Sequence, residues 1–335
     1  MSAPAPSMYS PAAKATAEKL GLKLGRANLE EFADTLLALA KADRNVLAVT
    51  SDSRGSGKLG PFGEALPKQI VEVGIAEQNL VGIAAGLASC GKKPFAVSPA
   101  CFLTARALEQ IKNDVCYSDH PVTLVGISAG VSYGALGSTH HSLHDFAALR
   151  AINNLTIVAP ADNTETREAV RLAAAHGKPV YLRFGKAPLY TLPGAEVPFA
   201  FGRVRQIRTG NDVAFLATGE TVIHALLAAA HLETVAGWKC RVLSLPTVKP
   251  LDTFAVLAAA HECRAIVTVE EHMVNGGLGE SVASLLAQHG IATRFKIAGI
   301  PDEYTVTGSQ ADIFRHYGLT MEGLAATAQE LLRRT

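Results

Sequence analysis

The chain has 335 residues, of which 48% are hydrophobic and 18% are charged. This length favours two domains of roughly 100 to 200 residues each, and the composition excludes a disordered or low-complexity protein. Lys and Arg total 31 against 30 Asp and Glu, so no net field draws the chain to nucleic acid or to an anionic membrane. The composition therefore favours a small-molecule substrate or a protein partner.

The five cysteines are odd in number and scattered, without a CxxC pair. That pattern argues against a disulfide framework and a zinc cage, and it predicts a reducing cytoplasm. The N-terminal stretch MSAPAPSMYSPAAKA lacks the apolar region of a secretory signal, so we expect residues 1–24 to be a flexible lead-in. No apolar run approaches the roughly 18 residues of a membrane span. We expect a soluble protein.

Short β-branched runs alternate with Ala- and Leu-rich helical stretches along the chain. In the first half the runs predict strands at residues 46–50, 70–73, 122–127, 155–158 and 180–184. After a turn-rich stretch with several prolines, further strands are predicted at residues 213–217, 240–245, 265–269 and 294–297. This alternation predicts parallel sheets with helices on both faces.

The predicted fold is therefore α/β, with two successive doubly wound domains. We expect the first at residues 25–190, a linker at 191–199 and the second at 200–335. Ligands of open α/β sheets bind beyond the carboxyl ends of the strands. The residues that follow each predicted strand are therefore the places to look for chemistry.

The first such place carries the sequence TSDSRGSGKLGPFG. Asp52, Arg54, Ser56 and Lys58 stand there among glycines, and such hydroxyls, amides and cations suit an anion such as a sugar phosphate. The stretch is not a Walker loop. An ordinary solvated surface loop explains the spacing equally well.

The next place begins with VEVGIAEQNLVGIAAGLAS, in which a strand ends at Val73 and a helix begins near Ala76. The helix is apolar on nearly every side, so we expect it to be buried all round. Glu77 in its first turn has two interpretations. It is either a charge at the positive end of the helix, worth about 0.3 to 1 kcal/mol, or a carboxyl in an apolar setting that shares a proton with a ligand. Its position beyond a strand end favours the second interpretation.

The same helix contains Gly82 and Gly86, which lie four residues apart and share one face. Glycines on one face allow another backbone to approach closely. The pattern fits a subunit interface and tight packing within the domain about equally well.

The segment VSPACFLTARALEQIKNDV follows another predicted strand, and its Phe102 is either a core residue or a ring on which a heterocycle stacks. Further on, GISAGVSYGALGSTHHSLHDF combines glycines with His140, His141 and His144. No Cys or Glu lies near enough to complete a zinc site, so we expect no metal in this chain. Proton handling or hydroxyl recognition is favoured over capping or packing.

Taken together, GIAEQNLVGIAAGLA, PACFLTARALEQIKNDVCY, GSTHH and APADNTETREAV resemble the pyrimidine-binding domain of transketolases. VTVEEHMVNGGLGE resembles their C-terminal domain. The resemblance extends from about Leu24 to near the end of the chain, and it is closest to the C-terminal subunits of bacterial split transketolases. It implies transfer of a two-carbon glycolaldehyde unit between a ketose phosphate and an aldose phosphate, with thiamine diphosphate as cofactor.

The resemblance also implies roles for individual residues. The family's catalytic glutamate, which hydrogen-bonds the aminopyrimidine of thiamine diphosphate, corresponds to Glu77. The aromatic residue that stacks on the pyrimidine corresponds to Phe102, and an aspartate near the cofactor corresponds to Asp52. The substrate-side histidine of the family corresponds to His140, for which either proton transfer or substrate binding is implied.

Positions at which transketolases hold a sugar phosphate correspond to Arg26, Ser56 and Arg183. Two positions depart from the family. Leu136 stands where many members carry an aspartate that reads an acceptor hydroxyl, and Ser128 stands where a further substrate histidine is usual. These departures imply a sugar phosphate other than the usual pentose pair, because a site built around a hydroxyl discriminates strongly.

The sequence contains no GDG motif, which in full-length transketolases holds the metal and the pyrophosphate. The resemblance therefore implies a partner, the N-terminal transketolase subunit, that supplies this motif and holds Mg²⁺ or Ca²⁺. An α2β2 assembly is expected. The alternatives are the β subunit of a 2-oxo-acid dehydrogenase, a deoxyxylulose phosphate synthase, and a non-catalytic scaffold subunit.

Overall fold

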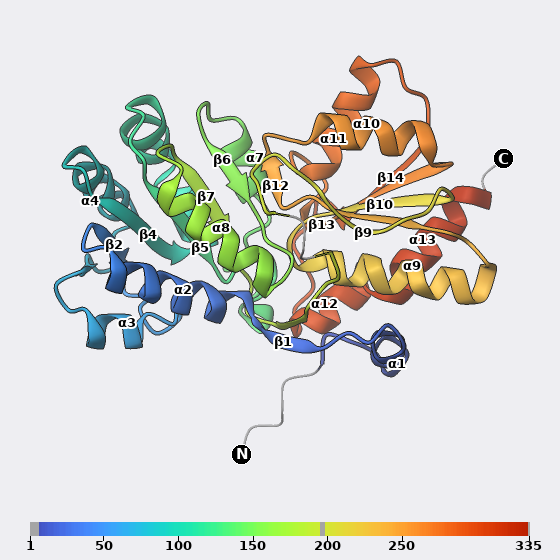
Figure 1. Ribbon diagram of the computed structural model, residues 1–335, viewed down its shortest axis with the longest axis horizontal. Helices are drawn as coiled ribbons and strands as arrows, with labels where there is room; N and C mark the ends of the chain where they lie inside the picture. Colours follow the sequence, from blue (N-terminus) through green and yellow to red (C-terminus); the bar gives the residue numbers. More distant parts are fainter. Residues whose placement is uncertain (1–6, 195–197, 334–335) are drawn as a thin grey trace.

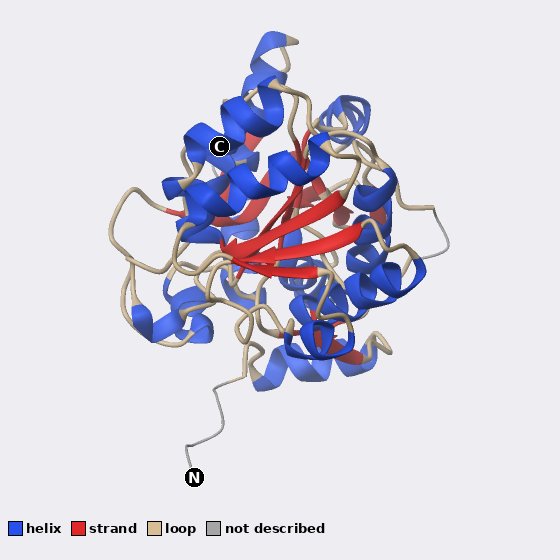
Figure 2. Ribbon diagram, turned by 90° about the vertical axis from the view of Figure 1, so that its left-hand side faces the viewer, coloured by secondary structure: helices blue, strands red, loops and turns tan. Residues whose placement is uncertain are grey.

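Two mostly parallel sheets, each covered by helices, make up the computed structural model, which describes residues 7–194 and 198–333. Figure 1 shows the two sheets side by side, one from the blue-to-green half of the chain and one from the yellow-to-red half. In Figure 2 helices flank the strands on both sides. The predicted α/β fold is confirmed.

The first sheet lies in the N-terminal half and takes one edge strand from the second half. Its order is β12 (Thr247–Lys249), β6 (Thr156–Val158), β7 (Val180–Arg183), β5 (Thr123–Ile127), β4 (Lys93–Pro99), β2 (Val46–Thr50) and β3 (Ile70–Glu72). All neighbours pair in parallel except β12, which is antiparallel to β6. The sequence pattern did not predict β12, although this strand joins the two halves of the chain.

Helices cover both faces of the first sheet. One face carries α2 (Asn28–Ala42), α3 (Gly60–Ala65) and α8 (Asn163–Ala175). The other carries α4 (Glu77–Ser89), α5 (Ala100–Arg106), α6 (Leu108–Gln110), η1 (Ile111–Tyr117) and α7 (Asp145–Arg150). Because the strands run in parallel, the loops after β2, β4, β5 and β7 emerge at one edge of the sheet.

The second sheet has the order β14 (Arg294–Ile300), β13 (Ala265–Met273), β10 (Val213–Ala217), β11 (Arg241–Ser244) and β9 (Arg205–Arg208), with β9 antiparallel. Its faces carry η3 (Gly219–Thr221), α9 (Val222–Ala236), α12 (Gln310–His316) and α13 (Met321–Arg333) on one side, and α10 (Thr253–Glu262) and α11 (Leu278–Gln288) on the other. Within residues 7–194 and 198–333, the helices are all too short or too polar to cross a bilayer.

The N-terminal segment is ordered from residue 7, so the expected flexible lead-in is wrong for residues 7–24. Helix α1 (Pro11–Lys19) buries its alanines against α9, and Figure 1 shows it beside the second domain. Strand β1 (Leu24–Ala27) pairs with β8 (Pro188–Tyr190). Small residues on one helix face and a Ser10 N-cap explain this order. Residues 1–6, and residues 195–197 of the expected linker, lie outside the described residues.

Helix α4 is open on one side, so the expected burial all round is wrong for this chain. Gln78, Asn79 and Gly86 are exposed. A Cβ atom at Gly82 or Gly86 would meet nothing within 4 Å. The glycines therefore do not serve tight packing within this chain, and a subunit interface stays a prediction.

Candidate functional site

Glu77 begins α4, and its carboxylate is only 3% exposed. Both carboxylate oxygens accept hydrogen bonds of 3.0 Å from Nη1 of Arg106, the last residue of α5. The expected apolar setting of Glu77 is therefore wrong, because a guanidinium faces it. The Arg106 side chain is 43% exposed, so it can swing into solvent and leave the buried carboxylate to a ligand.

Phe102 lies one helical turn before Arg106 and is half-buried. The guanidinium carbon of Arg106 stands 4.3 Å from the centroid of the Phe102 ring. The edge of the ring meets His140, with centroids 5.3 Å apart and planes at 73°. His140 in turn meets Tyr133, with centroids 5.5 Å apart. The structure thus brings Glu77, Phe102 and His140 around Arg106, and a flat ring can stack on Phe102 where Arg106 now lies.

A small cationic cavity adjoins this group. Ser56, Lys58 and Lys186 line its volume of about 250 Å³. The ammonium of Lys186 lies 4.0 Å from the centroid of the Tyr133 ring. Partial burial lowers the pKa of Lys186, and repulsion by Lys58 lowers it further. Two neighbouring cations with a hydroxyl beside them favour an anion, although Glu30 also contacts Lys58 at 3.5 Å.

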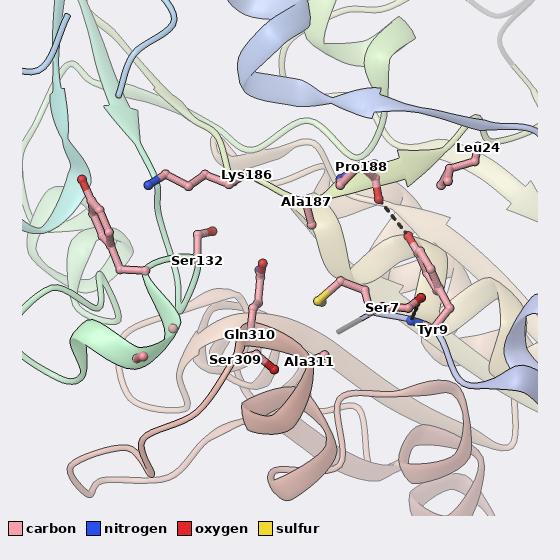
Figure 3. A pocket seen from close by; sticks show the side chains of 14 residues that line it. Ser7, Tyr9, Leu24, Ser132, Lys186, Ala187, Pro188, Ser309, Gln310 and Ala311 are labelled. Atoms are coloured by element: carbon pink, nitrogen blue, oxygen red, sulfur yellow. Dashed lines mark hydrogen bonds between the residues drawn. The ribbon is translucent and has the colours of Figure 1, made fainter. Parts of the chain in front are cut away.

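Lys186 also lines a larger cavity of about 570 Å³ between the two domains. Figure 3 shows Gln310 of α12 pointing into this cavity, with Ser132 beside it. The N-terminal segment forms the opposite wall, where the Tyr9 hydroxyl donates a hydrogen bond of 3.5 Å to the carbonyl oxygen of Pro188. The cationic cavity is therefore continuous with the boundary between the domains.

Asp52 and Arg26 lie outside the group around Arg106. Asp52 is exposed, has a φ of +51°, and its backbone N–H donates a 2.6 Å hydrogen bond to Glu72. Arg26 is bound by Glu31, with 2.9 Å between Nε and Oε2, and by Asp34. These carboxylates already neutralise Arg26. A cofactor contact of Asp52 and a phosphate contact of Arg26 stay predictions.

Arg183 is buried in the structure, so its expected place in a phosphate site is wrong. Its Nε donates a 2.7 Å hydrogen bond to Asp145, and its Nη2 donates to the carbonyl oxygens of Ser142 and Glu271 at 3.1 and 2.8 Å. The side chain is only 6% exposed. Arg183 ends β7, but the second domain covers that strand end and turns the guanidinium into an internal tie.

The two departures from the family pattern occupy different settings. Leu136 lies on the short helix η2 (Gly134–Leu136) and is 56% exposed, so its side chain is free to face an acceptor. Ser128 is buried with a φ of +53°. Partial burial raises the pKa of Tyr133, and the hydroxyls of Ser128 and Ser56 beside it oppose that effect.

The three histidines do not converge. Both ring nitrogens of His141 are occupied, by the Thr305 hydroxyl at 2.7 Å and the Gly134 carbonyl oxygen at 2.9 Å, while His144 lies 3.4 Å from Thr104. No three His, Cys, Asp or Glu side chains of residues 7–194 and 198–333 gather into a metal site. His140 alone joins the candidate site.

Sequence reasoning missed Arg106, Tyr133 and Lys186. Lys186 could have been found, because it lies three residues beyond the end of β7, where the rule for α/β sheets places chemistry. Tyr133 stood inside a glycine-rich segment that was already singled out for its histidines. Only the fold shows that Arg106 reaches Glu77, since the two residues are on different helices.

Comparison with known proteins gives one consistent answer. The family "Transketolase, pyrimidine binding domain" matches residues 26–191, and "Transketolase, C-terminal domain" matches residues 202–324. One of the two subunits of an apulose-4-phosphate transketolase from Phocaeicola vulgatus is 46% identical over 306 residues, which are 91% of this chain and 97% of that protein. A 6-deoxy-6-sulfo-D-fructose transketolase subunit of a Clostridium species is 33% identical, over 91% of this chain and 94% of that protein.

A solved structure described as a split gene transketolase, an inactive beta4 tetramer, superimposes with a TM-score of 0.81. It is 33% identical, and the match covers 92% of this chain and 98% of that one. The similarity therefore extends over nearly the full length of proteins that are themselves separate subunits.

Proposed function

We propose, from the premise that this chain belongs to the transketolase family, that it is the pyrimidine-binding subunit of a split, thiamine-diphosphate-dependent transketolase. The reaction is transfer of a glycolaldehyde unit from a ketose phosphate to an aldose phosphate. The observation that carries the proposal is the convergence of Glu77, Phe102 and His140 around the movable Arg106. The chain then supplies half of an active site.

The residues present fit the pyrimidine half of thiamine diphosphate. Glu77 offers a buried carboxylate that can hydrogen-bond a ring nitrogen and hold a proton there. Phe102 offers a ring face once Arg106 has moved aside. When bound, the cofactor supplies the carbanion equivalent that carries the two-carbon unit. His140 stands at the edge of Phe102, where it can donate to or accept from a substrate hydroxyl.

The cationic cavity is the proposed place for the anionic tail of the sugar. Lys186 and Lys58 supply charge there, and Ser56 supplies a hydroxyl. The two relatives from Phocaeicola and Clostridium are transketolases of apulose 4-phosphate and of 6-deoxy-6-sulfo-D-fructose, and each of these sugars carries an anion. Leu136 then faces the acceptor without a hydroxyl partner, which favours an acceptor outside the usual pentose pair.

The remainder of the site belongs to a partner. This chain contains no GDG motif, so the N-terminal transketolase subunit is proposed to bind the diphosphate and its Mg²⁺ or Ca²⁺ in an α2β2 assembly. The open face of α4 around Gly82 and Gly86 supports a contact between subunits there. The five free thiols support a reducing cytoplasm.

Reconstitution tests the proposal. The chain alone should bind thiamine diphosphate weakly in calorimetry and show no ketol transfer, because it lacks the charge-assisted contacts to the diphosphate. Addition of a GDG-carrying subunit from the same genome should restore both. Full cofactor binding and turnover by the isolated chain would contradict the split site, and pyruvate decarboxylation by the complex would favour a 2-oxo-acid dehydrogenase.

A further inference from the structure

Two buried carboxylates of the second domain reach across the domain boundary to loops of the first. Glu271, in β13, accepts a hydrogen bond of 2.8 Å from the backbone N–H of Val131. Glu220, in η3, accepts one of 3.0 Å from the backbone N–H of Gly185. Each carboxylate therefore holds the backbone of one loop that carries the candidate site.

The loops approach these carboxylates so closely that only glycine fits. A Cβ atom at Gly185 would lie 2.3 Å from Oε2 of Glu220, and one at Gly130 would lie 2.2 Å from the carboxyl carbon of Glu271. Lys186 directly follows the first of these glycines. Contacts of this kind fix the place of a loop, because neither a gap nor a larger residue is available to absorb a shift.

The base of the glycine-rich loop is held by Glu271 from both its side chain and its backbone. The Glu271 carbonyl oxygen accepts from Arg183, which also donates to the carbonyl oxygen of Ser142. Ser142 in turn forms an antiparallel bridge with Gly130. The loop that carries Tyr133 and His140 is thereby closed at its base and tied to β13.

We propose that Glu220 and Glu271 are positioning residues through which the second domain sets the geometry of the active site. Glu220 places Lys186, and Glu271 places the loop with Tyr133 and His140. A division of labour follows: Glu220 governs recognition of the anionic tail, and Glu271 governs the chemical step. The kinetic part of this inference rests on the proposed transketolase function, whereas the structural part does not.

The surroundings of the pair show that the tie does not depend on charge. Burial raises the pKa of Glu220, and the nearby Glu271 adds to that effect, while Arg183 opposes it. Burial also raises the pKa of Glu271, and Arg183 and Asp145 act on it in opposite senses. Tyr9 also lies near Glu220, and Gln310 donates to Glu271. In both the neutral and the ionised state one carboxyl oxygen accepts the N–H, so glutamine can replace either residue.

Glu270 provides a matched control. It is buried beside Glu271 on the same strand, but it accepts from the N–H groups of Leu278 and Gly279, at 2.6 and 2.8 Å, within its own domain. Its removal should cost stability without reaching the site loops. A general loss of fold and a specific loss of positioning can therefore be separated.

Hydrogen exchange in the assembled complex tests the positioning directly. Glu220→Ala should raise amide exchange at residues 184–190 but not at 128–141, and Glu271→Ala should do the reverse. Glu270→Ala should change neither loop, and the Gln variants at 220 and 271 should restore protection. Equal exchange changes in both loops for all three Ala variants would overturn the inference.

Kinetics of the same complexes test the division of labour. Glu220→Ala should raise KM for a phosphorylated sugar about tenfold, with kcat nearly unchanged and the KM for hydroxypyruvate untouched. Glu271→Ala should instead lower kcat about tenfold with either donor. The same change in both variants would contradict the division. If the wild-type complex has no ketol-transfer activity, the proposed function fails, and the exchange result alone decides the inference.

A double-mutant cycle tests the contact from the loop side. Gly185→Ala places a methyl group against Glu220 and should raise KM for the phosphorylated sugar as Glu220→Ala does. In the double variant the space left by Glu220 accommodates the methyl group, so the two effects should be clearly less than multiplicative. Multiplicative effects would show that Gly185 and Glu220 act independently, and would overturn the proposed contact.

Discussion

Buried glutamates of the two domains differ in what holds them. Glu77, at the open edge of the first domain, faces a side chain, Arg106, that is 43% exposed. Glu270 and Glu271, inside the second domain, accept hydrogen bonds from backbone N–H groups. A backbone donor cannot leave, whereas a solvent-exposed arginine can. The difference separates a carboxylate that is available to a ligand from carboxylates that hold the fold together.

Glu77→Gln breaks the comparison most strongly. It keeps the shape of the side chain and removes the titrating proton, so we expect kcat of the reconstituted enzyme to fall by about two to four orders of magnitude. The free energy of unfolding should change by less than about 1 kcal/mol. Steady-state kinetics and urea unfolding measure the two effects.

The matched control for Glu77 is Glu109→Gln, which changes an exposed carboxylate on α6. It should leave both quantities unchanged. Near-normal turnover of the Glu77 variant would reduce this residue to a charge at the start of a helix.

Arg183→Met tests the opposite end of the comparison, a tie inside the fold. Burial alone would raise the pKa of Asp145, but Arg183 and His272 outweigh burial and lower it. Removal of Arg183 leaves that carboxylate buried and unpaired, so we expect a loss of about 3 to 5 kcal/mol in the free energy of unfolding. Urea titration measures the loss, and activity should fall equally with phosphorylated and non-phosphorylated donors.

Arg171 provides the comparison for Arg183. Its side chain is 57% exposed and pairs with Glu168 at 3.1 Å, so Arg171→Met should cost less than about 1 kcal/mol. A selective rise in KM for phosphorylated donors in the Arg183 variant would restore the phosphate role expected from the family.

Lys186→Gln sharpens the comparison within the first domain. Loss of a hydrogen bond to a charged group should raise KM for a phosphorylated sugar by about 10- to 100-fold and leave hydroxypyruvate unaffected. Lys58→Gln should have a smaller effect, because Glu30 already shares that charge. Equal effects on both donors would place Lys186 outside the anion site.

The smallest expected effect concerns pH and Glu220. Burial raises the pKa of Glu220 above its ordinary value of 4.5, so the folded chain retains a proton that the unfolded chain has lost. The contribution to stability is present below pH 4.5 and is lost as the pH rises through the raised value in the folded state. Glu220→Gln should flatten this decline in urea unfolding measured from acid to neutral pH. An unchanged slope would mean that Glu220 is ionised in the fold.

Most of the architecture could be predicted because it depends on local pattern. The bounds of β2 and β10 agree with the expected strands at 46–50 and 213–217. Alternation of such runs with helical stretches identified the α/β class. Strand β12 escaped because it is short and pairs with a strand about 90 residues earlier in the chain, and no local signal carries that pairing. Helix α1 escaped because its stabilising face, α9, lies more than 200 residues away.

By itself, the sequence determined which side chains follow the strand ends, and so it identified Glu77, Phe102 and His140 as candidates. The tertiary structure decided which of the candidates share a site. It joined these three through Arg106, added Lys186, and removed Arg183 by covering the end of β7 with the second domain. The physical reason is that strand order follows from local hydrophobic periodicity, whereas exposure of a strand end depends on what packs against it.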